Sequence, residues 1–261
     1  MKITRQVIRV DGRSLGWWSL GLVAIALMYL AFYPAISDNA KVYDDIAKSL
    51  PEALQNLMAA DYSSPRGYLQ TEFFSGIGFI ILMVFFVGRG VGAIAGDEDR
   101  GRSELVLAGP VARQRYLLER ALALVLEGIL AWVLLMVVLL TLGPLFGLEV
   151  GFVPLAGALA SAITGALVFG LVAFFVGAAS GRNSLALGVG AAFAIGAYLF
   201  TLLSPIAKSL ENLQFLSPCR QAVGYAPLIN GLQWDQLGIL IGEALILIGL
   251  SVWAYCRRDL H

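Results

Sequence analysis

Six long apolar stretches separated by shorter polar segments dominate the pattern along this chain. They cover residues 16–36, 73–93, 121–146, 153–179, 185–204 and 236–256. A helix needs about 20 apolar residues to cross a hydrocarbon core about 30 Å thick. Continuous apolar runs differ from the alternating pattern of a transmembrane barrel, and helices pair every backbone polar group internally. The pattern predicts an all-α polytopic membrane protein with six transmembrane helices in a single domain over residues 1–261.

Composition and charge placement extend this picture. The mean hydropathy is +0.79, and only 14% of residues are charged, against about 25% in a soluble domain. If the N-terminus lies inside, 13 of the 18 Lys and Arg residues, Arg89 included, fall in cytoplasmic parts. The positive-inside rule therefore predicts that the N- and C-termini are both cytoplasmic. Cys219 and Cys256 then lie on opposite sides of the membrane and cannot pair.

The segments outside the spans carry patterns of their own. Basic residues recur at helical spacing in residues 1–15, which predicts an N-terminal interfacial amphipathic helix; a simple positive region before the first span is the alternative. Residues 37–71 keep apolar periodicity, so we expect one or two short helices on the outer face. Residues 205–235 combine prolines with apolar residues, and we expect them to enter the membrane surface or cap an opening.

Spans four and five are rich in small residues, which allow close approach of helix backbones. Ordinary helix packing is the preferred interpretation, with a substrate route second. The residues concerned are Gly157, Ala158, Ala160, Ser161, Gly165, Ala166, Gly170, Gly177, Gly188, Gly190 and Gly196.

Most signatures of an enzyme are missing. The only histidine is His261, so a histidine-based metal site or a histidine-activated nucleophile is unsupported. The sequence holds no GxxxxGK[ST], so the chain has no P-loop for ATP. We therefore predict no catalytic, cofactor-binding or metal-binding residues in this chain.

Two acidic residues, Glu127 and Glu243, lie one to two turns inside apolar stretches. A charge at the centre of a membrane helix costs roughly 2.5–3.5 kcal/mol on insertion scales, so it usually faces a partner or water. One interpretation is a proton or cation relay. The other is a neutral or hydrogen-bonded glutamate near the interface. Because no deep basic partner is evident, the second interpretation is favoured.

The densest charged segment is IAGDEDRGRSELVLAGPVARQRYLLER, residues 94–120. It separates two apolar runs and must lie on one side of the membrane. Gly101 permits a bend after an acidic run, and Pro110 ends a short apolar helix at 103–108. The result is a helix-turn-helix with ionic groups for a polar interface. A solvated loop that merely obeys the positive-inside rule is the alternative.

Within this charged segment, EDRGRSELVLAGPVAR at 98–113 resembles the E-E-x-G-T-x-x-x-L-L-x-x-P-V-S-R segment of type-2 (ABC-2) ABC transporter permeases. The C-terminal YCRRDL at 255–260 is similar to their F-x-R-R-D-L ending. Arg102 and Ala112 stand where the family has Thr and Ser. The resemblance implies that residues 94–120, hereafter the coupling segment, couple the permease to a separate ATPase. It assigns these residues to that role: Glu98, Gly101, Glu104, Pro110 and Arg113.

The resemblance also implies partners and location. It implies an exporter permease in the plasma (inner) membrane of a bacterium, in contact with membrane lipid and with no nucleic acid. ATP and Mg would be bound by two copies of a cytoplasmic ATP-binding-cassette ATPase, and a second permease copy, identical or a close paralogue, would complete the complex. The residues alone leave two alternatives: an ion-coupled secondary transporter that uses Glu127 and Glu243, or a non-transporting membrane scaffold.

Overall fold

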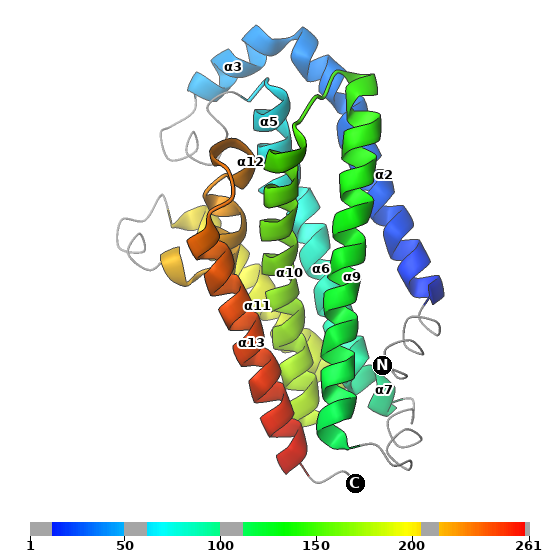
Figure 1. Ribbon diagram of the computed structural model, residues 1–261. Helices are drawn as coiled ribbons and strands as arrows, with labels where there is room; N and C mark the ends of the chain where they lie inside the picture. The colour runs from blue at the N-terminus through cyan, green and yellow to red at the C-terminus, as the bar shows by residue number, and fades with distance from the viewer. Residues whose placement is uncertain (1–11, 50–61, 100–111, 205–213, 259–261) are drawn as a thin grey trace.

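The computed structural model describes residues 12–49, 62–99, 112–204 and 214–258, and every regular element in these ranges is helical (Figure 1). Six spans are long and apolar enough to cross a membrane, which confirms the prediction of an all-α, six-span membrane protein. They are α2 (Gly12–Asp38), α5 (Pro65–Tyr68) continuing to α6 (Ile77–Ala93), α9 (Arg113–Leu142) with the 3-10 turn η2 (Gly143–Phe146), α10 (Phe152–Ser180), α11 (Asn183–Leu203) and α13 (Trp234–Arg257).

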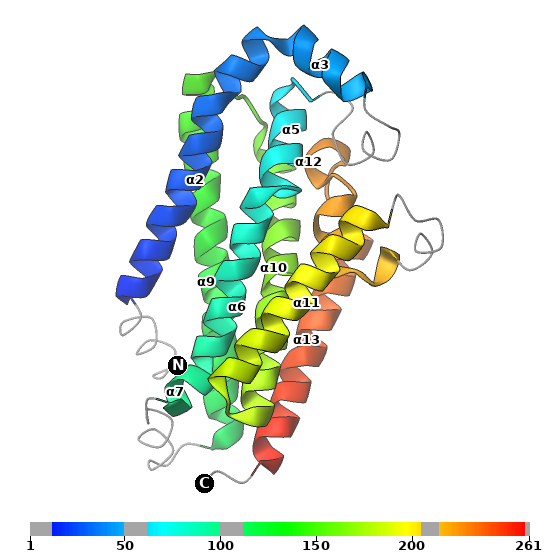
Figure 2. The same ribbon diagram turned by 180° about the vertical axis from the view of Figure 1, so that it is seen from behind.

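Helix α10 is the core of the bundle. It is the most deeply buried span and contacts α6, α9, α11 and α13. Figure 2 shows α2, α6 and α11 on the opposite face of the molecule from that seen in Figure 1. The short helix α7 (Ala95–Asp99) marks one end of the bundle, where α2 begins and α13 ends, and α3 (Ala40–Ser49) marks the other. These are called the α7 end and the α3 end.

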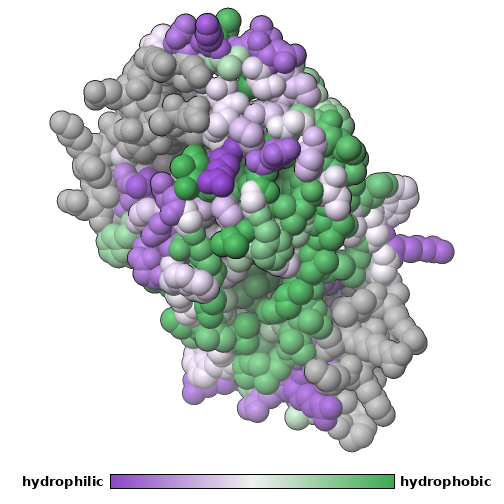
Figure 3. Space-filling view, turned by 45° about the horizontal axis from the view of Figure 1, so that its top comes forward, coloured by the Kyte–Doolittle hydropathy of each residue, from purple (hydrophilic) through white to green (hydrophobic). Residues whose placement is uncertain are grey.

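The surface agrees with residence in a membrane. A band of apolar side chains crosses the middle of the bundle, and hydrophilic residues gather at both ends (Figure 3). The predicted interfacial helix at 1–15 falls mostly outside the described residues, and its last four positions, 12–15, belong to α2. The short helix expected within residues 37–71 is present as α3.

Small residues bring α6 and α10 into direct backbone contact. A Cβ atom built on Gly90 would lie 2.0 Å from the carbonyl oxygen of Gly170, and one on Gly170 would lie 2.5 Å from that of Phe86. Neither position has room for a larger residue. Gly188 and Gly196 of α11 instead face open space. The packing interpretation is therefore correct for α10, where Gly157, Gly165 and Gly177 also contact neighbours, and for Gly190 of α11, which lies against Ala173 of α10.

Span two is longer than predicted and is interrupted. It begins at α5, passes through the π-helix η1 (Leu69–Phe74) and resumes as α6 after Gly76. Ser64 caps the start by accepting a hydrogen bond from the amide of Gly67 at 3.0 Å. The Tyr68 hydroxyl donates to the carbonyl oxygen of Tyr29 on α2 at 3.0 Å. The tyrosine contact holds the α3-end part of span two against α2.

The segment 214–230 folds back onto the α3 end of the bundle. Its π-helix η4 (Arg220–Gly224) and α12 (Pro227–Asn230) pack against α10. Gln70 of η1 holds both: its side chain donates to the Val223 carbonyl at 3.4 Å and accepts from the Leu228 amide at 3.1 Å. The same fold buries Cys219, and this burial raises the pKa of its thiol to about 12. The expectation that residues 205–235 enter the membrane surface or cap an opening stays a prediction, and residues 205–213 lie outside the described residues.

Candidate functional site

Two of the five predicted coupling residues, Glu98 and Arg113, lie in the described ranges. Gly101, Glu104 and Pro110 lie outside the described residues, so their role in coupling stays a prediction. Glu98 lies beside the end of α13, where its Oε2 forms an ion pair with the guanidinium of Arg258. Arg113, the first residue of α9, donates from Nη1 to the carbonyl oxygen of Arg258 at 3.0 Å. Residues on both sides of 100–111 therefore meet at Arg258.

Arg258 also contacts the end of α10. Its Nη1 donates to the carbonyl oxygens of Gly177 at 3.4 Å and Ala178 at 3.1 Å. A cation is favoured at a helix C-terminus, where the macrodipole is negative. Gly181, in left-handed conformation with φ 67°, closes α10; a Cβ atom there would lie 2.6 Å from Glu98 Oε2. Because Gly181 has no Cβ atom, the side chains of Glu98 and Arg258 can meet at the end of α10. Arg258, Glu98, Arg113, Gly177 and Ala178 are hereafter the Arg258 cluster.

A second ion pair joins α7 to α9. Asp97 pairs with Arg120, and both side chains are buried, with 4% and 8% exposed. The hydroxyl of Tyr116 donates to Asp97 Oδ2 at 3.2 Å, and the Arg120 guanidinium lies 5.4 Å from the Tyr116 ring centroid. The Tyr116 ring in turn packs against Tyr255 of α13, centroid to centroid 6.2 Å. The start of the coupling segment is thus tied to two spans.

A third ion pair lies deeper and corrects an expectation. Arg89 of α6 donates from Nε to Glu127 Oε2 of α9 at 2.7 Å, and its Nη2 contacts Oε1. The Arg89 side chain is 13% exposed and that of Glu127 is 2% exposed. The expectation that Glu127 has no deep basic partner is wrong, because Arg89 belongs to the interior of the bundle. The sequence indicates this pair only in part: the two residues flank the coupling segment on antiparallel helices, but the sequence does not fix the relative axial position of those helices.

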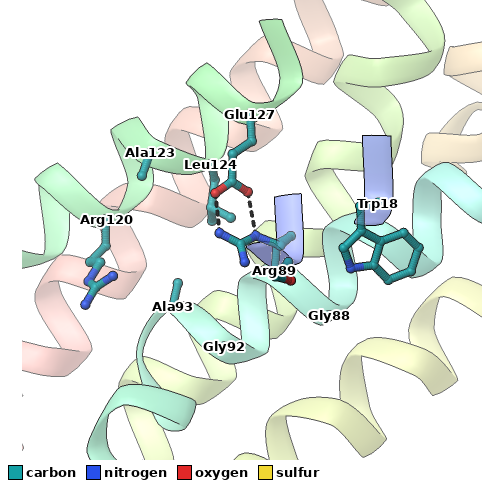
Figure 4. Close-up of a pocket in the computed structure, with 10 residues that line it drawn as sticks. Trp18, Gly88, Arg89, Gly92, Ala93, Arg120, Ala123, Leu124 and Glu127 are labelled. Carbon is teal, nitrogen blue, oxygen red and sulfur yellow. Dashed lines mark hydrogen bonds and ion pairs between the residues drawn. The ribbon is translucent and has the colours of Figure 1, made fainter. Parts of the chain in front are cut away.

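This third pair borders a polar cavity of about 260 Å³ between α2, α6 and α9. Figure 4 shows Arg89 and Glu127 facing each other between α6 and α9, with Arg120 also on the wall. Trp18 of α2 lies on the other side of Gly88 (Figure 4). Trp18 and Gly88 also line an apolar cavity of about 370 Å³ between α2, α6 and α11. One cavity is charged and the other is apolar, and they adjoin at these two residues.

Glu243 stands apart from these pairs. Its Oε1 accepts a hydrogen bond from Gln221 Nε2 at 3.4 Å, and its Oε2 is buried without a hydrogen-bond partner. Glu127 bonds Arg89 instead, so among the described residues the two glutamates share no partner and form no continuous relay. Within the same residues, no group of three or more His, Cys, Asp and Glu side chains is arranged to hold a metal ion.

The comparisons with known proteins give one clear finding. A family model described as "ABC-2 family transporter protein" matches residues 3–260, nearly the whole chain. A search of curated proteins finds no match.

Proposed function

This chain belongs to the ABC-2 family of transporter proteins, and on that basis we propose that it is the membrane permease subunit of an ABC exporter in the plasma (inner) membrane. Permeases of this family work with separate ATP-binding cassette ATPases. In our proposal two ATPase copies bind ATP and Mg and dock on the coupling segment. The sequence supports this division of labour, since it offers no P-loop of its own.

The observation that carries the proposal is the anchoring of the coupling segment on both sides of 100–111. Glu98 precedes these residues and Arg113 follows them, and both contact Arg258. Asp97 and Arg120 add a buried connection to α9. A force applied to the segment by a bound ATPase therefore reaches the spans through ion pairs and hydrogen bonds, and rigid-body movement of packed helices is a known response to such forces.

The remaining surface supports pairing with a second permease, identical or closely related. Helix α11 exposes a run of large apolar side chains, among them Leu187, Phe193 and Ile195, and is one of the two least buried spans.

The apolar cavity between α2, α6 and α11 adjoins this exposed face of α11. We propose that the exported cargo is hydrophobic or amphipathic, because a cavity of this lining offers no polar partner to a hydrophilic one.

Site-specific photo-crosslinking tests the docking surface. A photo-reactive residue at Glu104, inside the coupling segment, is expected to form an adduct with the ATPase in membranes. The matched control is Val42, which is 57% exposed on α3 at the opposite end of the bundle. No adduct from Glu104, or equal adducts from both positions, would contradict the proposal. ATP-dependent flux in vesicles that hold both subunits distinguishes a transporter from a scaffold.

The ion-coupled alternative is tested by the same vesicles. Transport that continues without any ATPase and stops on Glu127→Gln would favour it. The structure gives this alternative little support, because Glu127 is already engaged by Arg89 and shares no described partner with Glu243.

A further inference from the structure

Arg258 joins four helices at one residue. Helix α13 ends at Arg257, and Arg258 follows in extended conformation with φ −79° and ψ 130°. Its side chain contacts Glu98 of α7 and the last turn of α10, while its carbonyl oxygen accepts a hydrogen bond from Arg113 of α9. The ends of α7, α9, α10 and α13 are therefore connected through a single side chain and its own backbone.

The chemistry of this position requires an arginine. The guanidinium carries five N–H donors in a planar fork, which lets it serve a carboxylate and carbonyl oxygens together. A lysine ammonium is a point charge on a flexible stem and cannot hold the same set in fixed directions. The guanidinium also lies 5.6 Å from the ring centroid of Tyr255, a cation–π distance. The two ion-pair side chains are 19% and 15% exposed, so water screens the pair only in part.

The cluster and its neighbour Tyr255 also contain buried polar atoms with incomplete hydrogen bonding. Glu98 Oε1 and the hydroxyl oxygen of Tyr255 are both buried and make no hydrogen bond of good geometry, although the two side chains interact with each other. Buried polar atoms of this kind are uncommon and call for an explanation. A second arrangement of the same groups during a transport cycle supplies one, since a fully satisfied cluster would resist rearrangement.

We propose that Arg258 is a positioning residue of the ATPase-coupling segment and transmits movement of that segment to α10. The inference rests on the proposed function, because it presupposes an ATPase docked at 94–120. It adds a residue outside that segment and a route: from Glu98 through the Arg258 guanidinium to the Gly177 and Ala178 carbonyls. Since α10 contacts four other spans, its displacement reaches most of the bundle.

The test separates docking from transmission. An environment-sensitive thiol fluorophore is attached to Phe152→Cys, because Phe152 is the first residue of α10 and is 60% exposed at the end far from Arg258. Cys219 and Cys256 are replaced by serine. Two quantities are measured on the permease–ATPase complex: the amount of ATPase that co-purifies, and the change in fluorescence on adding ATP with vanadate.

With Arg258→Ala we expect co-purification within about twofold of the parent protein and a fluorescence response reduced at least fivefold. Arg257→Ala is the matched control, since Arg257 is exposed and its guanidinium stacks on Trp253 at 4.5 Å; its response should be unchanged. Glu98→Gln should resemble Arg258→Ala. Arg258→Lys, which keeps the charge and is the safer variant for folding, should lose at least half of the response.

Each other result has a definite meaning. A full response with Arg258→Ala or Arg258→Lys overturns the transmission role. A response lost only in proportion to thermal stability, and lost equally with Arg257→Ala, assigns Arg258 a merely structural role and also overturns it. Failure of the parent protein to retain any ATPase rejects the proposed function itself.

Discussion

The ion pair between Arg89 and Glu127 gives the sharpest quantitative prediction. Arg89→Leu leaves a carboxylate that is 2% exposed without its ion-pair partner. Removing one member of a buried pair typically costs about 3–5 kcal/mol. We therefore expect a loss of about 3 kcal/mol in the free energy of unfolding. Glu127→Leu should cost a similar amount, because it leaves the arginine uncompensated.

The double variant Arg89→Leu/Glu127→Leu tests whether the two side chains stabilise the protein as a coupled pair. Replacing both members of a buried pair by apolar residues is often neutral or stabilising, and both helices here lie in an apolar setting. Arg89→Leu/Glu127→Leu should therefore be more stable than either single variant. We expect a coupling energy of at least about 2 kcal/mol from the double-mutant cycle. The free energies are to be measured by equilibrium unfolding of the purified protein in mixed micelles, followed by tryptophan fluorescence.

The control is the pair formed by Arg115 and Glu119 on α9, with Nε to Oε1 at 3.1 Å. Arg115 is 68% exposed, so Arg115→Leu should change the stability by no more than about 0.5 kcal/mol. If the double variant loses the sum of the two single losses, Arg89 and Glu127 are energetically independent. That result would refute a coupled ion pair between Arg89 and Glu127.

Two further predictions concern packing and accessibility. Gly90→Ala should destabilise the protein by about 2 kcal/mol or more, because the new Cβ would meet the Gly170 carbonyl. The control is Gly92→Ala, which should be neutral because nothing lies within 4 Å of its Cβ position. Thermal unfolding compares the two variants, and equal melting temperatures would contradict the contact. The raised pKa of the Cys219 thiol keeps this thiol neutral from pH 7 to pH 9. Intact-mass measurement after N-ethylmaleimide treatment should therefore show one adduct across that range, on the half-buried Cys256. A second adduct that grows with pH would show that Cys219 is accessible.

The six spans could be predicted from sequence because hydropathy over 20 residues records burial in lipid directly. The start of span two could not. Gln70 and Glu72 lower the local hydropathy, yet both are satisfied inside the protein: Gln70 bonds segment 214–230, and Glu72 accepts a hydrogen bond from the Tyr62 hydroxyl at 2.7 Å. A hydropathy pattern scores each polar side chain as unfavourable in a membrane, whether or not another part of the protein forms a hydrogen bond with it.

The candidate site was predictable only in part, for a related reason. The motif identified Glu98 and Arg113, but the contacts of both depend on Arg258, more than 140 residues further along the chain. The same holds for Arg89 and Glu127, because their contact depends on the relative axial position of α6 and α9. Three-dimensional packing sets that axial position, and a single sequence contains no direct record of it.

The contact between Gly90 and Gly170 has a consequence for how motion in this protein can be measured. With backbone atoms in contact, α6 and α10 cannot separate or slide without losing that fit, so the two helices move together and form one rigid frame. Distances between labels on these two helices should stay constant through an ATP cycle. Displacements of the other spans can then be referred to this frame, and a solute cannot pass along the seam that it closes.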